Sequence, residues 1–513
     1  MKRIIKGVSV KPYQWCRDKV EILSWDMVGK RTLKVAIILF WVLMNILLLR
    51  HQLWAPPPPV LLQTMAAITE SMEEWWGIYY QGEKIGYAAQ TVTPDPEGYL
   101  VRSSSVLRLN LLGKNQAVKT RLKMLANPDW ALRNFDFELN SNGVQFKVRG
   151  NFAGGKLQLE MDSGGQRTKT DIPLGQPPYL LAALKPYIVT QNLEPGKEHL
   201  FPTFDPSTLS QQVTTVVVEG REKITINGET EPAIRIRQRF KGISVVSWVD
   251  GKGRTLKEET PTGLSLVREG PEAAKILTET KSISLDLIQQ TAVPLESPIV
   301  DSDKKQFLKL KLSGFDPSQF PLDGGRQRLS GDILEIRRED LTQLRSYTIP
   351  LQEPRFASYV QPTPFLQSDH PQIRGLVQRV LGGEVDALKA VTKIQKWVYE
   401  GLAKEPTVSI PNALEVLQTK KGDCNEHTVL FNAMARAVGI PAKTVVGVVY
   451  LRGAFYYHAW SEVWLGQWVS VDSVLNQFPA DVTHTKFLEG EIDRQIDIIQ
   501  LIGKLKIKVL EAS

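Results

Sequence analysis

Cysteine and histidine are scarce in this chain, which contains two cysteines and six histidines in 513 residues. These few residues do not show the paired spacing of a zinc site, and no glycine-rich phosphate-binding motif occurs. The two absences argue against a metalloenzyme and against a nucleotide-binding protein. We therefore predict no metal ligands and no cofactor, so that any chemistry has to come from ordinary side chains.

The formal net charge of +8 is concentrated at the N-terminus. Residues 1–34 contain nine lysines and arginines against three acidic residues, which leaves a net charge of +2 for the rest of the chain. A nucleic-acid partner is not expected, because the excess positive charge does not lie on a folded surface.

A hydrophobic run from Val35 to Leu49 follows this basic leader and contains one polar residue, Asn45. Residues 35–54 would form a helix of about 30 Å, which is long enough to cross a bilayer. A cleaved signal peptide is the alternative, but the long leader and the lack of a small-residue cleavage site favour an uncleaved transmembrane helix. The positive-inside rule then predicts a single-pass protein of the cytoplasmic (inner) membrane. Residues 1–34 would lie in the cytoplasm and everything after the helix would be periplasmic or extracellular.

The rest of the chain predicts an α+β protein built from successive parts. Residues 55–75 are expected to form a proline-rich spacer and a short helix. Residues 76–290 contain many short β-branched segments separated by turn pairs such as Asn227-Gly228 and Asp250-Gly251. This pattern predicts a large, strongly curved antiparallel β domain with a helical patch near Tyr179–Leu184. Such a sheet can carry an amphiphile or lipid in its concavity, but we expect the domain to act as a spacer or as a docking surface for an envelope protein.

Two further parts complete the predicted organisation. Residues 291–364 indicate a small β linker module, and residues 365–513 indicate a second α+β domain. The strands expected in the linker module are Phe307–Leu312, Ile333–Arg337 and Arg345–Ile349. The second domain is expected to begin with helices over Asp369–Leu381 and Glu384–Leu402 and to end with a strand over Leu501–Glu511.

The second domain contains a cysteine at the predicted start of a helix. Asp423 is a good N-cap and Glu426 lies three residues further on, which predicts a capping box. A helix is therefore expected to begin at Cys424 and to end before Gly439. The positive end of the helix dipole favours the thiolate of this cysteine, but the two neighbouring carboxylates oppose it. An imidazolium from elsewhere would be needed to ionise the thiol.

A histidine and an aspartate follow on two predicted strands, Phe455–Leu465 and Trp468–Val474. A two-residue turn between these strands would put His458 and Asp472 on opposite faces of the sheet. A three-residue loop, Leu465–Gln467, would put them on one face as diagonal neighbours. We predict the three-residue loop, because it allows the aspartate to hold the imidazole while the other ring nitrogen faces the thiol.

The motifs GDCNEHTVLFNAMARAVGIPAKTVVG, HAWSEVW and WVSVD resemble the transglutaminase-like core, a rearranged relative of papain-type thiol enzymes. The resemblance covers roughly residues 364–488. It implies that Cys424 is the nucleophile, that His458 is the base and acid, and that Asp472 orients the imidazole. It does not fix the reaction, since the family includes protein cross-linkers, proteases, amidases and inactive relatives.

Two hypotheses follow from this resemblance. The first is a membrane-anchored thiol enzyme that attacks amide bonds of peptide or protein substrates through a thioester, as a cysteine protease, an amidase or a protein-glutamine acyltransferase. The alternative is a non-catalytic binding or scaffold protein of the cell envelope that keeps the fold.

Four other side chains are candidates for the cleft or the oxyanion site. Trp397 and Asn412 lie upstream of the cysteine, although core and turn roles would also explain them. Trp460 is expected to line the cleft, and His484 is expected to return to its rim. The backbone N–H of Cys424 is a further candidate oxyanion donor.

Three polar residues near these motifs are expected to have other roles. His427 lies on the same helix as Cys424, so it is a poor partner for the thiol. Glu462 is expected to be satisfied structurally, and Asp481 lacks the spaced acidic neighbours of a calcium loop.

Overall fold

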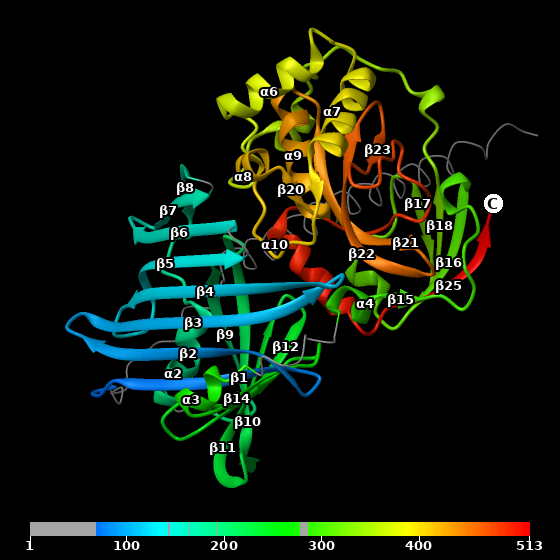
Figure 1. The fold of residues 1–513 in the computed structure, drawn as a ribbon. Helices are drawn as coiled ribbons and strands as arrows, with labels where there is room; N and C mark the ends of the chain where they lie inside the picture. The colour runs from blue at the N-terminus through cyan, green and yellow to red at the C-terminus, as the bar shows by residue number, and fades with distance from the viewer. Residues whose placement is uncertain (1–67, 142–143, 164, 192, 278–285) are drawn as a thin grey trace, which may run out of the picture. The chain divides into compact units, whose positions relative to one another are not determined.

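The computed structural model describes residues 68–513 apart from 142–143, 164, 192 and 278–285. The N-terminal half of the described residues forms one antiparallel sheet of 14 strands (Figure 1). Strands β8 to β1 are neighbours in reverse chain order, β1 pairs with β14, and the order then runs back to β9. The strands are β1 (Met72–Tyr80), β2 (Glu83–Asp95), β3 (Gly98–Leu111), β4 (Lys114–Ala126), β5 (Leu132–Ser141), β6 (Val144–Ala153), β7 (Lys156–Ser163), β8 (Gln166–Pro173), β9 (Glu198–Asp205), β10 (Ser210–Ile226), β11 (Glu229–Phe240), β12 (Ile243–Val249), β13 (Thr255–Glu259) and β14 (Leu264–Arg268).

The turn chemistry of the sequence accounts for the meander. Between β10 and β11, for example, Asn227 and Gly228 have φ values of 51° and 87°, the left-handed conformations of a tight hairpin turn. The predicted helical patch is α2 (Leu181–Thr190), whose Tyr187 packs edge-to-face on Phe201. The short helix predicted up to residue 75 is wrong over its described part, residues 68–75, where no residue is helical and the last four begin β1.

The C-terminal half contains a smaller sheet and the helices that pack on it. The sheet has the strand order β15-β22-β21-β24, with β23 beside β22. Its strands are β15 (Val293–Pro294), β21 (Ala442–Leu451), β22 (Ala454–Trp464), β23 (Trp468–Val471) and β24 (Thr485–Glu489). The longest helices described in this half all precede β21 and are α6 (Pro371–Leu381), α7 (Ala387–Gly401), α8 (Ala413–Thr419) and α9 (Cys424–Ala437). The helices predicted near α6 and α7 are therefore confirmed.

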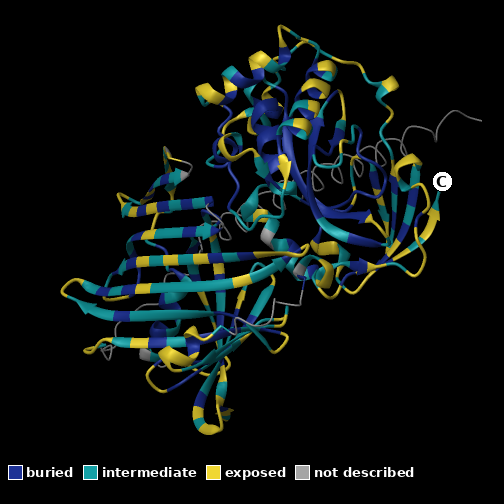
Figure 2. Ribbon diagram, viewed as in Figure 1, coloured by how far each residue is buried: buried dark blue, intermediate teal, exposed yellow. Residues whose placement is uncertain are grey.

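Helix α9 lies at the centre of this half. It contacts α6, α7 and α8 as well as β21 and β22, and its residues from Glu426 to Arg436 are all buried. Figure 2 shows α9, β21 and β22 as mostly buried, whereas strands of the large sheet mix buried, intermediate and exposed residues. Some polar side chains of α9 form hydrogen bonds inside the core, as when Asn432 Nδ2 donates to Thr444 Oγ1 at 2.9 Å.

A four-stranded antiparallel sheet supports the smaller sheet. Its order is β17-β18-β16-β25, from β16 (Phe307–Ser313), β17 (Gln327–Ser330), β18 (Ile333–Arg337) and β25 (Lys506–Ala512). The last strand of the chain thus pairs with β16 in the predicted linker module. The strand predicted over Arg345–Ile349 is wrong, because only Thr348 makes an isolated bridge there. The domain boundaries stay predictions.

The predicted membrane anchor requires a correction. Residues 35–54 lie outside the described residues, and no helix within the described ranges of 68–513 is long and apolar enough to cross a membrane. The longest of these helices, α7, has 15 residues, whereas a span needs about 20 apolar ones. The single-pass inner-membrane location and the periplasmic or extracellular placement of Cys424 are therefore not supported.

The close pairing of β21 with β24 provides a test of this fold. A Cβ atom on Gly447 of β21 would overlap the carbonyl oxygen of Thr485 and lie 3.0 Å from the Trp460 ring. Gly447→Ala should therefore destabilise the protein by about 1–3 kcal/mol, measured by the urea midpoint of unfolding.

Gly375→Ala is the matched control. Gly375 lies in α6, and a Cβ there would meet Arg379 Nη1 at 3.5 Å, an ordinary contact. This substitution should leave stability unchanged or raise it by about 0.5–1 kcal/mol. Equal urea midpoints for Gly447→Ala and the wild type would contradict the described pairing.

Candidate active site

Cys424 is the first residue of α9, as the capping box predicted. The backbone N–H of Asp423 donates to Glu426 Oε2 at 2.9 Å, and Asp423 Oδ1 accepts from the backbone of Asn425. Cys424 is a free cysteine, and its thiol lies within hydrogen-bond reach of the backbone of Ala459 in β22. The thiol is therefore held beside the residue that follows His458.

The surroundings of this thiol favour its neutral form. Burial raises the pKa of Cys424 well above its ordinary value, and the negative charges of Asp423, Glu426 and Asp472 raise it further. The hydrogen bond from Ala459 acts in the opposite direction but does not reverse the shift. The first turn of α9 thus does not produce a resting thiolate.

The register of β22 and β23 brings His458 and Asp472 to one face. Trp464 pairs with Trp468, so the loop between them has the three residues predicted, and Gly466 adopts a φ of 87°. The backbone N–H of Leu465 donates to the carbonyl of Gln467 at 2.8 Å and closes the loop. The predicted loop length is confirmed.

His458 Nε2 lies 2.7 Å from Asp472 Oδ2. A carboxylate can only accept, so Nε2 of His458 carries a proton and Nδ1 is left with a lone pair when the ring is neutral. The other oxygen, Asp472 Oδ1, accepts from the backbone N–H groups of Val474 and Leu475 at 2.7 and 2.9 Å. Both carboxylate oxygens of Asp472 are therefore held by hydrogen bonds.

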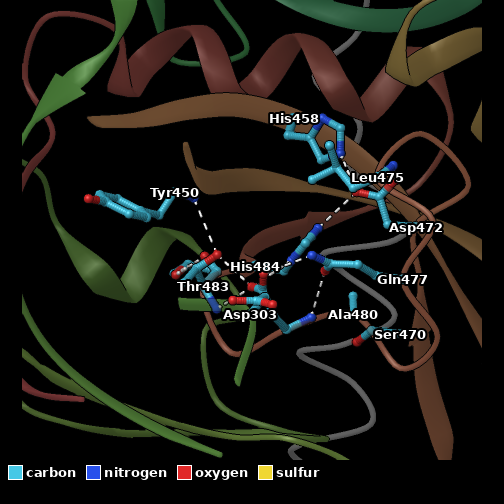
Figure 3. Close-up of polar contacts among 12 residues, drawn as sticks. Asp303, Tyr450, His458, Ser470, Asp472, Leu475, Gln477, Ala480, Thr483 and His484 are labelled. Carbon is cyan, nitrogen blue, oxygen red and sulfur yellow. Dashed lines mark hydrogen bonds and ion pairs between the residues drawn. The ribbon is translucent and has the colours of Figure 1, made fainter. Parts of the chain in front are cut away.

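A second imidazole uses the same carboxylate oxygen. His484 Nε2 lies 2.9 Å from Asp472 Oδ2, and His484 Nδ1 lies 3.2 Å from Asp481 Oδ1. Figure 3 shows Asp472 between the rings of His458 and His484. The predicted position of His484 at the cleft rim is too peripheral, because this side chain is fully buried.

The pKa values of this group reflect the shared contacts. Burial alone would lower the pKa of His484, but the hydrogen bonds and charges of Asp472 and Asp481 raise it to about 9. Burial alone would raise the pKa of Asp472, but the two imidazoles, through charge when protonated and through hydrogen bonds, hold it well below its usual range. The pKa of Asp481 is lowered against burial by His484, Thr483 and Gln477.

The donor atoms of His458, Asp472 and His484 lie within 4.8 Å of one another, close enough to raise the question of a metal site. The 2.7 and 2.9 Å contacts are direct donor–acceptor distances. A bound zinc ion would instead separate its ligands, since it sits about 2.0–2.1 Å from each nitrogen. The geometry therefore fits a hydrogen-bonded triad better than a set of metal ligands.

The other candidate residues occupy different environments. Trp460 is buried, stacks 6.2 Å from the His458 ring and meets the His484 ring edge-on at 5.2 Å. Asn412 is the N-cap of α8, and Trp397 packs against the helical core. Asn412 and Trp397 thus occupy a helix cap and the helical core, respectively. His427 Nδ1 lies 2.7 Å from the carbonyl of Asp423, within its own helix.

Arg326, from the predicted linker module, forms a hydrogen-bonded brace on this site that was not predicted from the sequence. Arg326 Nη1 pairs with Glu339 at 2.9 Å and also donates to Ser470 Oγ and to the carbonyl of Ala480. Its Nη2 donates to the carbonyl of Asp481. The brace thus fixes β23 and the loop that carries Asp481, and no local sequence motif indicates it.

A buried charge cluster lies further along the same strands. Glu462 Oε2 of β22 lies 3.1 Å from Lys443 Nζ, and Glu462 Oε1 lies 3.0 Å from Lys486 Nζ. Glu489 pairs with the same two lysines at 2.8 and 2.7 Å. Glu462 is therefore satisfied structurally, by two cations that link β21, β22 and β24.

Comparisons with known proteins locate the family of this region. Residues 374–473 match the model of the transglutaminase-like superfamily. A curated uncharacterized protein of Haemophilus influenzae is 28% identical over 123 residues, which cover 21% of this chain and 32% of that protein. The match thus spans about a third of the length of that relative.

Two solved structures are similar over part of the chain. A candidate cysteine protease of Cytophaga hutchinsonii is 14% identical, with 41% of this chain and 86% of that chain covered and a TM-score of 0.27. A β-barrel-like protein of unknown function from Brucella abortus is 11% identical, with 38% and 94% covered and a TM-score of 0.32. TM-scores this low carry no argument about function.

The shifted pKa of His484 predicts how stability depends on pH. Because its pKa rises from 6.5 to about 9 on folding, its contribution is fully present below pH 6.5 and is lost as the pH rises through about 9. At about 1.4 kcal/mol per pKa unit, the free energy of unfolding should fall by on the order of 3 kcal/mol over this pH range. His484→Gln should remove this alkaline decline, measured by urea midpoints between pH 6 and 10.

His199→Gln is the matched control. His199 lies in β9, and burial lowers its pKa below 6.5. Its contribution to the free energy of unfolding therefore changes at acidic pH, below 6.5, and not at alkaline pH. The alkaline decline should therefore persist in this variant. If His484→Gln lost as much stability at alkaline pH as the wild type does, the alkaline decline could not be assigned to His484.

Proposed function

Because residues 374–473 belong to the transglutaminase-like superfamily, which is related to papain-type thiol enzymes, we propose that the chain is a thiol enzyme acting on amide bonds of peptide-like substrates. Cys424 is the proposed nucleophile, His458 the base and acid, and Asp472 the residue that orients the imidazole. The observation that carries this proposal is the 2.7 Å contact between His458 Nε2 and Asp472 Oδ2. The hydrogen bond between the thiol and the backbone of Ala459 supports it.

In the proposed first step, Cys424 Sγ attacks the carbonyl carbon of the amide while His458 Nδ1 accepts the thiol proton. The carbonyl oxygen becomes an oxyanion, for which the backbone N–H of Cys424 in the first turn of α9 is the proposed donor. The C–N bond then breaks as His458 returns the proton to the leaving amine. A thioester remains on Cys424.

The thioester can be resolved in two ways. If water attacks it, the products are a carboxylic acid and the regenerated thiol, which is the reaction of a protease or amidase. If an amine attacks it, a new amide forms, which is the reaction of a protein-glutamine acyltransferase. In both cases neutral His458 removes a proton from the attacking group.

A binding protein that keeps the fold without catalysis is the second candidate. The raised pKa of Cys424 favours it, because a neutral thiol is a weaker nucleophile than a thiolate. Transfer of the thiol proton to His458 during the attack removes this difficulty, so we retain the enzyme as the proposal.

Alkylation tests the proposed nucleophile. In a Cys16→Ser background, where Cys424 is the remaining cysteine, iodoacetamide should add one carbamidomethyl group to the protein. Cys424→Ala should abolish this mass increase, measured on the intact protein. Asp472→Asn should slow hydrolysis of p-nitrophenyl acetate by about 10²–10⁴-fold, because the imidazole loses its orientation and tautomer.

Lys396→Gln provides the matched control, since Lys396 is an exposed residue of α7 that forms a surface ion pair with Glu400 at 3.9 Å. This variant should be alkylated by iodoacetamide and should hydrolyse p-nitrophenyl acetate to the same extent as the wild type. If Cys424 stays unmodified under native conditions but is alkylated after denaturation, and no ester is hydrolysed, the binding-protein hypothesis replaces the enzyme.

A further inference from the structure

His484 is held between two carboxylates, one at each ring nitrogen. Nε2 lies 2.9 Å from Asp472 Oδ2, Nδ1 lies 3.2 Å from Asp481 Oδ1, and the side chain has no exposed surface. A neutral imidazole carries one N–H, whereas two carboxylate oxygens require two donors. The geometry is therefore satisfied by the imidazolium form of His484.

The two carboxylates are themselves fixed as acceptors. Asp481 Oδ1 accepts from the backbone N–H and the hydroxyl of Thr483 at 2.8 and 2.6 Å, and Asp481 Oδ2 accepts from Gln477 at 3.0 Å. Asp472 Oδ1 accepts two backbone N–H groups. Such donors stabilise the ionised form of each carboxylate, so neither is expected to carry the proton that His484 needs.

Other ionisable groups approach this cluster from the surrounding elements. They are His458 and Glu462 of β22, Lys486 of β24, the N-cap Asp423 with Cys424, Glu426 and His427 of α9, and Arg326, which donates to the carbonyl of Asp481. Lys486 and Glu462 are paired with each other, and Arg326 with Glu339. His484, by contrast, contacts the same oxygen of Asp472 as His458 does.

We propose that His484 is a positioning residue that remains protonated at neutral pH and thereby keeps His458 neutral and able to accept the thiol proton. This inference rests on the proposed function of Cys424 and His458. Two imidazoles share one oxygen of Asp472, so a second positive charge on His458 would be repelled by the first. Without the charge of His484, the buried carboxylate would favour protonation of His458, which would then be unable to act as a base.

The size of the effect follows from the separation of the rings. Their centroids lie 5.8 Å apart. Two unit charges at that distance, with an effective dielectric constant of about 20, alter a protonation equilibrium by about two pH units. His484 keeps its own proton throughout the reaction, while the thiol proton moves to His458 Nδ1 and from there to the leaving amine.

Nitrogen NMR of the imidazoles tests the charge of His484 directly. In full-length protein labelled with ¹⁵N-histidine, the resonances assigned to His484 by their loss in His484→Gln should show two protonated nitrogens at pH 7 and up to about pH 9. A single protonated nitrogen at pH 7 would overturn the proposal. This readout does not require catalysis.

The pH dependence of turnover tests the effect on His458. With p-nitrophenyl acetate as substrate and deacylation rate-limiting, the acid limb of the kcat profile should move up by about 1–2 pH units in both His484→Gln and His484→Phe. Activity lost at pH 7 should be recovered at higher pH. If His484 acted only through its hydrogen bonds, His484→Gln, which keeps one donor, would leave the acid limb at the wild-type position. That outcome would overturn the proposal.

Thr483→Val is the matched control, because it removes an uncharged hydrogen bond from Asp481 without changing the charge of the cluster. Its acid limb should stay in place. If the wild type hydrolyses no ester, the proposed function fails, but the histidine spectra still decide the inference. The titration midpoint of His458 should then rise by about 1–2 pH units in His484→Gln, and an unchanged midpoint would overturn it.

Discussion

The carboxylate of Asp472 is the group on which the candidate site depends, since one of its oxygens accepts from two imidazoles and the other accepts from two backbone N–H groups. This arrangement fixes the tautomer of His458 and leaves its Nδ1 with a lone pair. It also links the imidazole proposed to act as base with a second imidazole that lies deeper in the core. Orientation and proton affinity are therefore controlled through one side chain.

Support for that carboxylate comes from parts of the chain that are distant in sequence. Arg326 bridges Glu339, Ser470 and the loop at residues 480–481, and Gln327 exchanges hydrogen bonds with the backbone of Lys486 in β24. The strands around residues 307–337 thus do more than connect two domains. Residues next to and within these strands hydrogen-bond to the loop before His484 and to the strand after it.

The state of the thiol shows which electrostatic effect dominates. A helix N-terminus favours an anion by about 0.3–1 kcal/mol when partly exposed. Burial of the thiol and the nearby charges of Asp423, Glu426 and Asp472 act in the opposite direction and raise the pKa of Cys424. The resting cysteine is therefore expected to be a thiol, because burial and these charges outweigh the helix dipole. The position of Cys424 at the start of α9 therefore serves its placement more than its ionisation.

The sequence alone determined the features that depend on neighbours within a few residues. Asp423 and Glu426 specify the start of α9, and strand parity with the loop Leu465–Gln467 places His458 and Asp472 on one face. Only the tertiary structure decided the features that depend on which surfaces meet. The contacts of Asp472 with His484 and of Arg326 with Ala480 join residues 12 and 154 positions apart, and neither has a local pattern. Burial also depends on the assembled fold, so the raised pKa values of Cys424 and His484 follow from packing. Hydrophobicity by itself led to the membrane prediction, which the described residues do not support.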